Sequence, residues 1–252
     1  MFANPSVLWV VLPVYNEAPR LPQLLHRWKN TSALLSRPVV FVLVDDGSTD
    51  GSAEILQAFT RYQPSVHLVI HRPNQGLGAT IRDGLNRVME NCRPEDLVTT
   101  MDSDGTHPPE LLPTMIERQK RTKADVVIAS RFRMGSRVEG LSMNRRILSI
   151  GAATLLKILA PVPGVRDYTC GFRLLRASAL LQTQNMCPKG VVSAKGFEST
   201  LELLLNLVRS GATFTEVAFH LDYAAKAGSS HMQIGRTIKG VLTTAAQFRF
   251  RI

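Results

Sequence analysis

Short apolar runs alternate with longer amphipathic segments along the first half of the chain. The apolar runs predict buried strands at 7–12, 39–44, 66–70, 97–101 and 126–129. Between them, apolar residues three or four positions apart predict helices at about 21–28, 55–62, 77–88 and 111–121. A strand that is apolar throughout is typical of a parallel sheet, because helices cover both of its faces. The alternation therefore predicts an α/β fold with a doubly wound, mostly parallel sheet.

The pattern changes after position 131. Arginines at 131, 133, 137, 145 and 146 lead into a largely apolar segment, 147–159, which ends before Pro161-Val162-Pro163-Gly164. Basic residues followed by an apolar helix are typical of an element at a membrane interface, although a buried helix of the same domain gives the same pattern. A last helix is predicted at 234–250, and its end alternates arginines with large apolar residues. We expect amphipathic C-terminal helices, suited either to a membrane surface or to a simple amphipathic terminus.

Composition narrows the range of partners and compartments. The 252 residues carry a formal net charge of +10, which calls for nucleic acid, an anionic membrane or a phosphorylated substrate. Only 6% of the residues are aromatic, so we expect no base-stacking surface for nucleic acid. No apolar run reaches the roughly 18 residues of a membrane span, and the first run is too short for a signal peptide. Three scattered cysteines favour a reducing, cytoplasmic setting over a disulfide framework or a zinc site.

Two acids end the fourth predicted strand, in the run Met101-Asp102-Ser103-Asp104-Gly105. Such a pair suits a hard cation, because Mg²⁺ or Mn²⁺ held by one or two carboxylates completes its shell with substrate phosphates. An acidic turn before a helix at 108–110 is the alternative. Ligands of parallel α/β sheets bind at the carboxyl ends of the strands, which favours the metal site. Other polar residues fall at the same predicted edge: Tyr15, Asn16, Glu17, Asp45, Asp46 and Arg131.

Several motifs occur in order along nearly the whole chain. They are VVLPVYNE at 10–17, VDDGSTDGS at 44–52, NQGLGAT at 74–80, MDSDGTHPPE at 101–110, ASRF at 129–132, RR at 145–146 and DYTCGFRLLR at 167–176. With them the chain resembles family 2 glycosyltransferases of the GT-A fold, in the branch of dolichyl- or polyprenyl-phosphate mannosyl and glucosyl transferases. A GxGxxG fingerprint is missing after the first strand, which argues against a Rossmann oxidoreductase.

The resemblance implies a donor site and a metal site. The sugar nucleotide would be held by Pro13, Tyr15, Glu17, Val44 and Asp46, with Ser103 beside it. Carboxylates suit ribose hydroxyls and base amino groups as acceptors. The metal, Mg²⁺ or Mn²⁺, would be held by Asp102, Asp104 and a third ligand at Thr106, where relatives often carry glutamine. His107 is the other candidate third ligand, unless its role is structural.

Cationic residues would hold the phosphates. The resemblance places Arg131 at the donor phosphates and Arg145 near the lipid phosphate, with a solvated surface charge as the alternative for each. Guanidinium groups suit both places because they bind phosphates bidentately. A loop at 226–232 would close over the diphosphate through Lys226 and His231. Relatives carry lysine at the latter position, so this departure predicts weaker or pH-dependent donor binding.

The activity that the resemblance implies is inverting, metal-dependent transfer of a hexose to a polyprenyl phosphate. The donor would be GDP-mannose or, second, UDP-glucose. Asp102, Asp104 and Arg131 would be catalytic because they stabilise the departing diphosphate. We expect one domain over 1–252, with a nucleotide-sugar half at 1–132 and an acceptor and membrane-facing half at 133–252. The enzyme would sit peripherally at the cytoplasmic face of a membrane, alone or with a small membrane-anchored partner.

Two other functions fit the same sequence. One is a glycosyltransferase of the same fold with a soluble or polysaccharide acceptor, which keeps every donor-side residue. The other is a catalytically silent module whose basic surface binds a membrane. A thermal shift with Mn²⁺ and GDP or UDP separates an enzyme from a silent module.

Overall fold

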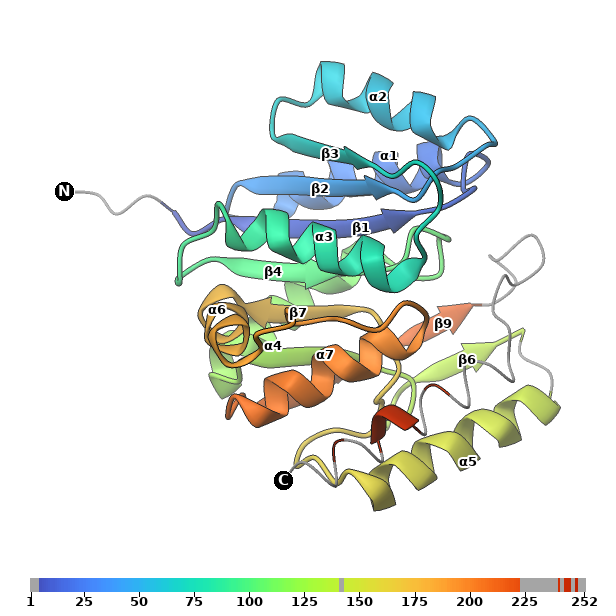
Figure 1. The fold of residues 1–252 in the computed structure, drawn as a ribbon, viewed down its shortest axis with the longest axis vertical. Helices are drawn as coiled ribbons and strands as arrows, with labels where there is room; N and C mark the ends of the chain where they lie inside the picture. The colour runs from blue at the N-terminus through green and yellow to red at the C-terminus, as the bar shows by residue number, and fades with distance from the viewer. Residues whose placement is uncertain (1–4, 141–142, 223–239, 241–242, 246–247, 249–252) are drawn as a thin grey trace.

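The computed structural model describes residues 5–140, 143–222, 240, 243–245 and 248, with only the backbone of 143–150 (Figure 1). Its first half contains every predicted element, with bounds that differ by a few residues. The strands are β1 (Leu8–Val14), β2 (Val39–Asp45), β3 (Val66–Ile70), β4 (Leu97–Thr100) and β5 (Val126–Ser130). The helices are α1 (Leu21–Leu34), α2 (Ser52–Tyr62), α3 (Leu77–Met89) and α4 (Leu112–Thr122), the last preceded by a 3₁₀ turn at Pro109–Leu111.

The second half contains elements that the apolar pattern missed. They are β6 (Arg137–Glu139), β7 (Arg173–Arg176), α6 (Ala177–Met186), α7 (Glu198–Arg209), β8 (Phe214–Ala218) and β9 (His220–Asp222). The predicted apolar helix is also present, as α5 (Met143–Leu159). The predicted helix at 234–250 falls almost entirely outside the described residues.

Seven strands form one sheet in the order β3-β2-β1-β4-β7-β5-β8. β7 runs antiparallel between β4 and β5, whereas the other neighbouring pairs are parallel. The mostly parallel sheet is thus confirmed, and its antiparallel member β7 is a strand that the apolar pattern did not predict. That strand has only two apolar residues, Leu174 and Leu175, between two arginines. β6 and β9 form a separate parallel pair.

Helices cover both faces of the sheet. In Figure 1, α3 and α7 lie in front of it and α1 and α4 lie behind. α3 packs closely on the sheet because position 84 is glycine: a Cβ there would lie 2.5 Å from the Val11 Cγ1. β1, β2 and β5 are largely apolar and almost fully buried, as expected for strands covered on both sides, whereas the edge strand β3 is only half-buried.

The sequence of α5 fits either a helix at a membrane interface or a buried helix of the same domain, and the structure shows features of both. Leu156 is buried, whereas Leu155 is 41% exposed and Ile158 is 65% exposed. The helix therefore packs on the domain through one side and presents apolar side chains to its surroundings on another. Among the described helices, none has the length and apolar character needed to cross a membrane.

Candidate functional site

Sheet register brings predicted donor residues together. Pro13 in β1 pairs directly with Val44 in β2, and Val14 pairs with Asp45. Ser103, which follows β4, donates a hydrogen bond of 2.7 Å from its hydroxyl to the Pro13 carbonyl oxygen. Three residues predicted to contact the nucleotide, taken from three separate motifs, thus lie at one edge of the sheet.

The loops after β1 and β2 are tied to each other by hydrogen bonds. The Asn16 amide N–H donates to the Ser48 hydroxyl at 3.0 Å, and the Glu17 amide donates to the Ser52 hydroxyl at 2.8 Å. In return, the Asn16 side-chain oxygen accepts from the Thr49 amide at 2.8 Å. These contacts hold the segment that carries Tyr15, which is 37% exposed, and Glu17. The predicted nucleotide contacts therefore belong to a braced loop.

Glu17 and Asp50 are engaged in the same region. The Glu17 carboxylate pairs with the Arg20 guanidinium at 2.9 Å. Asp50 accepts from the Ala18 amide at 2.9 Å and from the Ser52 amide and hydroxyl at 3.0 and 2.6 Å. Burial raises the pKa of Asp50, but these hydrogen bonds outweigh it and hold the pKa below its ordinary value. Asp50 is therefore an anionic anchor just before α2, and it ties the loop after β1 to the start of that helix.

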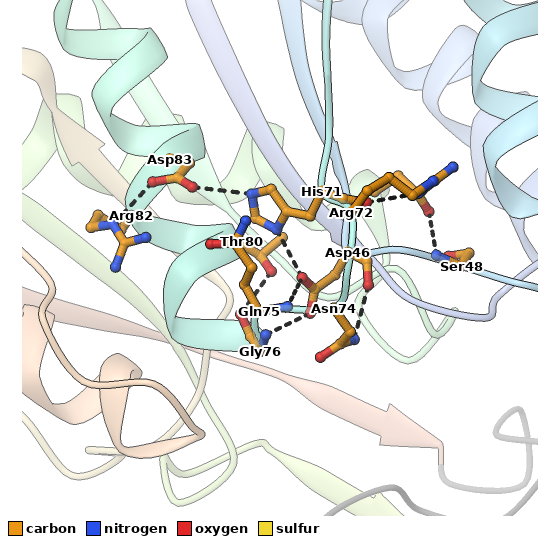
Figure 2. Close-up of polar contacts among 11 residues, drawn as sticks. Asp46, Ser48, His71, Arg72, Asn74, Gln75, Gly76, Thr80, Arg82 and Asp83 are labelled. Atoms are coloured by element: carbon orange, nitrogen blue, oxygen red, sulfur yellow. Dashed lines mark hydrogen bonds and ion pairs between the residues drawn. The ribbon is translucent and has the colours of Figure 1, made fainter.

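Asp46 is buried at the centre of a polar network (Figure 2). Its carboxylate accepts from the backbone N–H groups of Gln75 and Gly76, at 2.9 Å each, and meets the Nδ1 of His71 at 2.8 Å. The other ring nitrogen, Nε2, lies 3.0 Å from the Asp83 carboxylate of α3. The residue predicted to contact the base and ribose thus also holds the loop after β3. We missed His71 and Asp83, since a lone histidine 25 residues from its partner carries no local signal.

The amino-terminal end of α3 meets the loop before α7. The Gly78 amide donates to the Lys195 carbonyl oxygen at 2.9 Å. A Cβ at position 78 would lie 1.8 Å from the Ala194 carbonyl oxygen, so only glycine fits. This contact brings α7, which the sequence did not predict, to the carboxyl edge of the sheet.

The acidic pair follows β4, as predicted. The Asp102 side chain is 48% exposed, and its backbone N–H donates to the Nδ1 of His107 at 2.9 Å. His107 is itself buried, with its ring stacked on Phe172 at 5.4 Å between centroids and edge-on to Phe219. The structure thus favours the structural role for His107, as the residue that orients Asp102.

Thr106 is hydrogen-bonded to Asp104 of the acidic pair. Its amide and hydroxyl both donate to the Asp104 Oδ1, at 3.1 and 2.5 Å. Its predicted metal contact stays a prediction. Across the part of the chain that the structure describes, no three His, Cys, Asp or Glu side chains group to hold a metal ion. Asp102 and Asp104 instead fit the mode in which one or two carboxylates share Mg²⁺ or Mn²⁺ with substrate phosphates.

Arg131, at the end of β5, grips the buried carboxylate of Asp167. Its Nε and Nη2 donate to the two carboxylate oxygens at 2.7 Å each, and its backbone N–H donates at 3.0 Å. Nη2 also donates to the Thr169 hydroxyl at 2.7 Å. Burial raises the pKa of Asp167, but the Arg131 charge and hydrogen bonds outweigh it and hold the pKa below its ordinary value. The predicted phosphate-binding arginine thus stands in a fixed orientation. Sequence reasoning missed this pairing, although Arg131 and Asp167 both lie in motifs that carry the family resemblance.

Two buried charged residues, Glu216 and Arg173, form hydrogen bonds with the backbone around Asp167. The Glu216 carboxylate of β8 accepts from the amides of Arg166 and Asp167 at 2.6 and 2.8 Å. Arg173 of β7 donates to the Tyr168 and Thr200 carbonyl oxygens at 2.8 and 2.7 Å, and burial lowers its pKa to about 10. Residues of β7 and α7 also border a small pocket beside Asp102, lined by Gly171, Arg173 and Thr200 among others.

The remaining predicted site residues lie outside the described side chains. Lys226 and His231 fall in 223–239, and only the backbone of Arg145 is described. The structure therefore brings together the predicted donor-side and metal residues that it describes. The contacts of Lys226 and His231 with the diphosphate, and of Arg145 with the acceptor phosphate, stay predictions.

Comparisons with known proteins identify the family of this chain. The model of glycosyl transferase family 2 matches residues 9–183. Polyprenol monophosphomannose synthase of Mycolicibacterium smegmatis is 30% identical over 210 residues, which cover 82% of this chain and 74% of that protein. Undecaprenyl-phosphate 4-deoxy-4-formamido-L-arabinose transferase of Pseudomonas aeruginosa is 39% identical over 178 residues, which cover 67% of this chain and 47% of that protein.

A solved structure shows the same fold. Glucosyl-3-phosphoglycerate synthase of Mycobacterium tuberculosis, in complex with Mn²⁺, uridine diphosphate and glucosyl-3-phosphoglycerate, aligns with a TM-score of 0.65 at 19% identity. The alignment covers 98% of this chain and 80% of that one. The fold is therefore of the GT-A type, as the motifs suggested. Because the family match spans more than half of the chain, this protein belongs to glycosyl transferase family 2.

Proposed function

We propose that this glycosyltransferase moves a hexose, with inversion, from a nucleotide diphosphate sugar to a polyprenyl phosphate. The observation that carries the proposal is the meeting of Pro13, Val44 and Ser103 beside the acidic pair. These residues come from three motifs that hold the donor in the family. The two curated relatives described above are both named for transfers that involve a polyprenyl chain.

The donor we propose is GDP-mannose, with UDP-glucose second. One relative is named as a monophosphomannose synthase, and the related solved structure holds uridine diphosphate. The other relative is named for an arabinose derivative, so the sugar has weaker support than the acceptor class. Tyr15, Glu17 and Asp46 would contact the base and ribose, since carboxylates accept from ribose hydroxyls and base amino groups.

The residues that would hold Mg²⁺ or Mn²⁺ are Asp102 and Asp104. When bound, the cation offsets the charge of the donor diphosphate. Thr106 fixes the Asp104 carboxylate by two hydrogen bonds, and His107 fixes the backbone of Asp102. The protein thus presents two oriented carboxylates to the cation and the donor phosphates, and the third ligand at Thr106 remains part of the proposal.

Fixed cations would assist the departure of the nucleotide diphosphate. Arg131 is held by Asp167 and needs no reorientation as charge develops, which is how a preorganised group stabilises a leaving group. Lys226 and His231 would close over the same diphosphate, and Arg145 would hold the acceptor phosphate. That phosphate is already anionic, so one of its oxygens attacks the anomeric carbon as the bond to the diphosphate breaks, without a strong base.

We also propose a peripheral position at the cytoplasmic face of a membrane, alone or with a small membrane-anchored partner. Leu155 and Ile158 of α5 are exposed, and the net charge of +10 suits an anionic leaflet. A polyprenyl phosphate keeps its chain in the bilayer, so its enzyme must approach that surface.

The test is a panel of labelled nucleotide sugars with polyprenyl phosphate and Mn²⁺, scored for organic-extractable product. We expect Asp102→Ala and Asp104→Ala to lower turnover by about 1,000-fold, because both remove a ligand of the metal that stabilises the leaving group. Glu54→Ala, an exposed acid of α2, is the matched control. Product that forms only with a soluble acceptor would favour the rival glycosyltransferase, and full turnover in both variants would remove the metal site.

A further inference from the structure

We propose that His71 is a positioning residue for the donor nucleotide, which it serves as an imidazolium ion clamped between Asp46 and Asp83. The inference rests on the proposed function, because it concerns how the donor pocket of that enzyme is kept in shape. His71 does not belong to any motif in which the family resemblance placed a substrate contact.

The ring has a carboxylate at each nitrogen. Nδ1 lies 2.8 Å from the Asp46 Oδ1, and Nε2 lies 3.0 Å from the Asp83 Oδ2. A neutral imidazole carries one N–H and would leave one carboxylate facing a lone pair, whereas the imidazolium donates to both. The ring is 4% exposed, so water does not replace a lost contact. The two hydrogen bonds to carboxylates therefore favour a proton on both nitrogens.

The surrounding charges are balanced around this ion. Asp46 and Asp83 are the two carboxylates that face it. Arg82 on α3 donates to the second oxygen of Asp83 at 3.0 Å, and Arg72 donates to Asp45 at 3.1 Å. Each arginine is paired with a carboxylate oxygen that His71 does not use. His71 therefore contributes the cation that lies between Asp46 and Asp83.

Asp46, which directly follows β2, is hydrogen-bonded to the end of β1 and to the segment after β3. Its backbone N–H donates to the Val14 carbonyl oxygen at 2.8 Å, and its own carbonyl oxygen accepts from the Asn74 side chain at 2.9 Å. Its carboxylate receives the amides of Gln75 and Gly76. The end of β1 and the segment that follows β3 are thus both held to Asp46, and Figure 2 shows His71 between Asp46 and α3. Loss of the imidazolium would loosen the pocket on the side where Pro13 and Val44 meet.

A loosened pocket affects donor binding more than chemistry. Preorganised binding groups raise affinity because the ordering cost is met before the ligand arrives. The acidic pair and Arg131 belong to other loops, with contacts of their own. His71→Gln should therefore raise the donor KM and the Kd of the nucleoside diphosphate by about tenfold, the size of one charge-assisted hydrogen bond, and leave kcat nearly unchanged.

His67→Gln is the matched control. His67 lies on β3, four residues before His71, and its ring packs at 5.8 Å from Trp9. No carboxylate pairs with it among the residues that the structure describes. A general cost of losing a histidine from this part of the chain would appear in both variants, whereas the donor effect should appear only in His71→Gln.

A direct measurement on the unmodified protein needs no variant. The ¹⁵N shifts of the His71 ring at pH 7 distinguish an imidazolium from either neutral tautomer. We expect two protonated ring nitrogens. If His71→Gln does not fold, Asp83→Asn replaces it, since the Asp83 side chain is 30% exposed and lies at the outer end of the clamp.

The outcomes separate this inference from the proposed function. Failure of the unmodified protein to bind GDP or UDP with Mn²⁺ would overturn the proposed function and, with it, this inference. Normal nucleotide binding with a neutral His71 ring would overturn the inference alone. So would a donor Kd in His71→Gln, or in its replacement, that matches the His67→Gln control. An imidazolium ring together with weakened donor binding and unchanged kcat supports it.

Discussion

The donor-side loops and the Arg131 region each hold a buried carboxylate at the carboxyl edge of the sheet, but by different means. Asp46 is held by two backbone amides and a histidine. Asp167 is held by the two guanidinium hydrogen bonds of Arg131 together with the backbone amides of 131, 169 and 170. A histidine that loses its partner is able to release its proton, whereas an arginine stays charged. We therefore expect the loss of the Asp46 carboxylate to destabilise the fold less than the loss of the Asp167 carboxylate.

The difference follows from topology. The donor-side loops are successive connections of parallel strands, so their contacts join neighbouring segments of the chain. The Arg131 region depends on β7, which enters antiparallel between β4 and β5 and carries 167–176 back into the sheet. Buried charged side chains of β7 and β8 then bind the backbone around Asp167, through Arg173 and Glu216. The ion pair between Arg131 and Asp167 adds to these backbone contacts.

The largest expected effect is on Asp167. Asp167→Asn leaves Arg131 charged without its buried partner, and we expect a loss of about 3–5 kcal/mol in the free energy of unfolding. Asp46→Asn should cost less, about 1–3 kcal/mol, because it does not leave a permanently charged guanidinium without its partner. Urea denaturation at pH 7 measures both. Equal losses would contradict the comparison.

Acid unfolding provides an independent check on the same ion pair. The pKa of Asp167 is lower in the folded chain than its ordinary value, so its stabilising contribution is present above about pH 4. That contribution is lost as the pH falls through the folded pKa. The stability of Asp167→Asn should therefore fall less steeply below pH 4 than that of the unmodified protein. A parallel decline would show that Asp167 does not contribute this way.

Arg173 tests the same comparison through a substitution with a smaller expected loss of stability. Arg173→Lys keeps a cation, but one ammonium group does not span the carbonyl oxygens of Tyr168 and Thr200. We expect a loss of about 2 kcal/mol, the size of one hydrogen bond to a charged group. Arg176→Lys, at the half-buried end of the same strand, is the control and should change the unfolding free energy little. Similar losses in the two variants would refute a specific role for Arg173.

His107 connects the acidic pair to the second half and carries the smallest expected effect. His107→Phe keeps a ring against Phe172 but removes the acceptor for the Asp102 amide. We expect the Mn²⁺ concentration for half-maximal transfer to rise about tenfold, as for other losses of a group that orients a metal ligand. His26→Phe, at an exposed position of α1, controls for the added phenyl ring. An unchanged metal requirement would show that Asp102 needs no support from His107.

Much of the first half was predictable because its signals are local. Buried apolar strands and helices with an apolar stripe can be recognised from a short stretch of sequence. The motifs in this half pointed to Pro13, Val44 and Ser103. β7 could not be predicted the same way, since two leucines between arginines do not identify a strand. Its place in the sheet comes from pairing with β4 and β5, far away in the chain.

The sequence by itself determined the order of strands and helices in the first half, the family and the edge where the acids gather. Only the tertiary structure decided which charges meet: Asp46 with His71, Arg131 with Asp167, and Arg173 with two carbonyl oxygens. The physical reason is that burial makes such groups depend on an exact partner, and partners 25 or 36 residues apart are chosen by sheet pairing and packing.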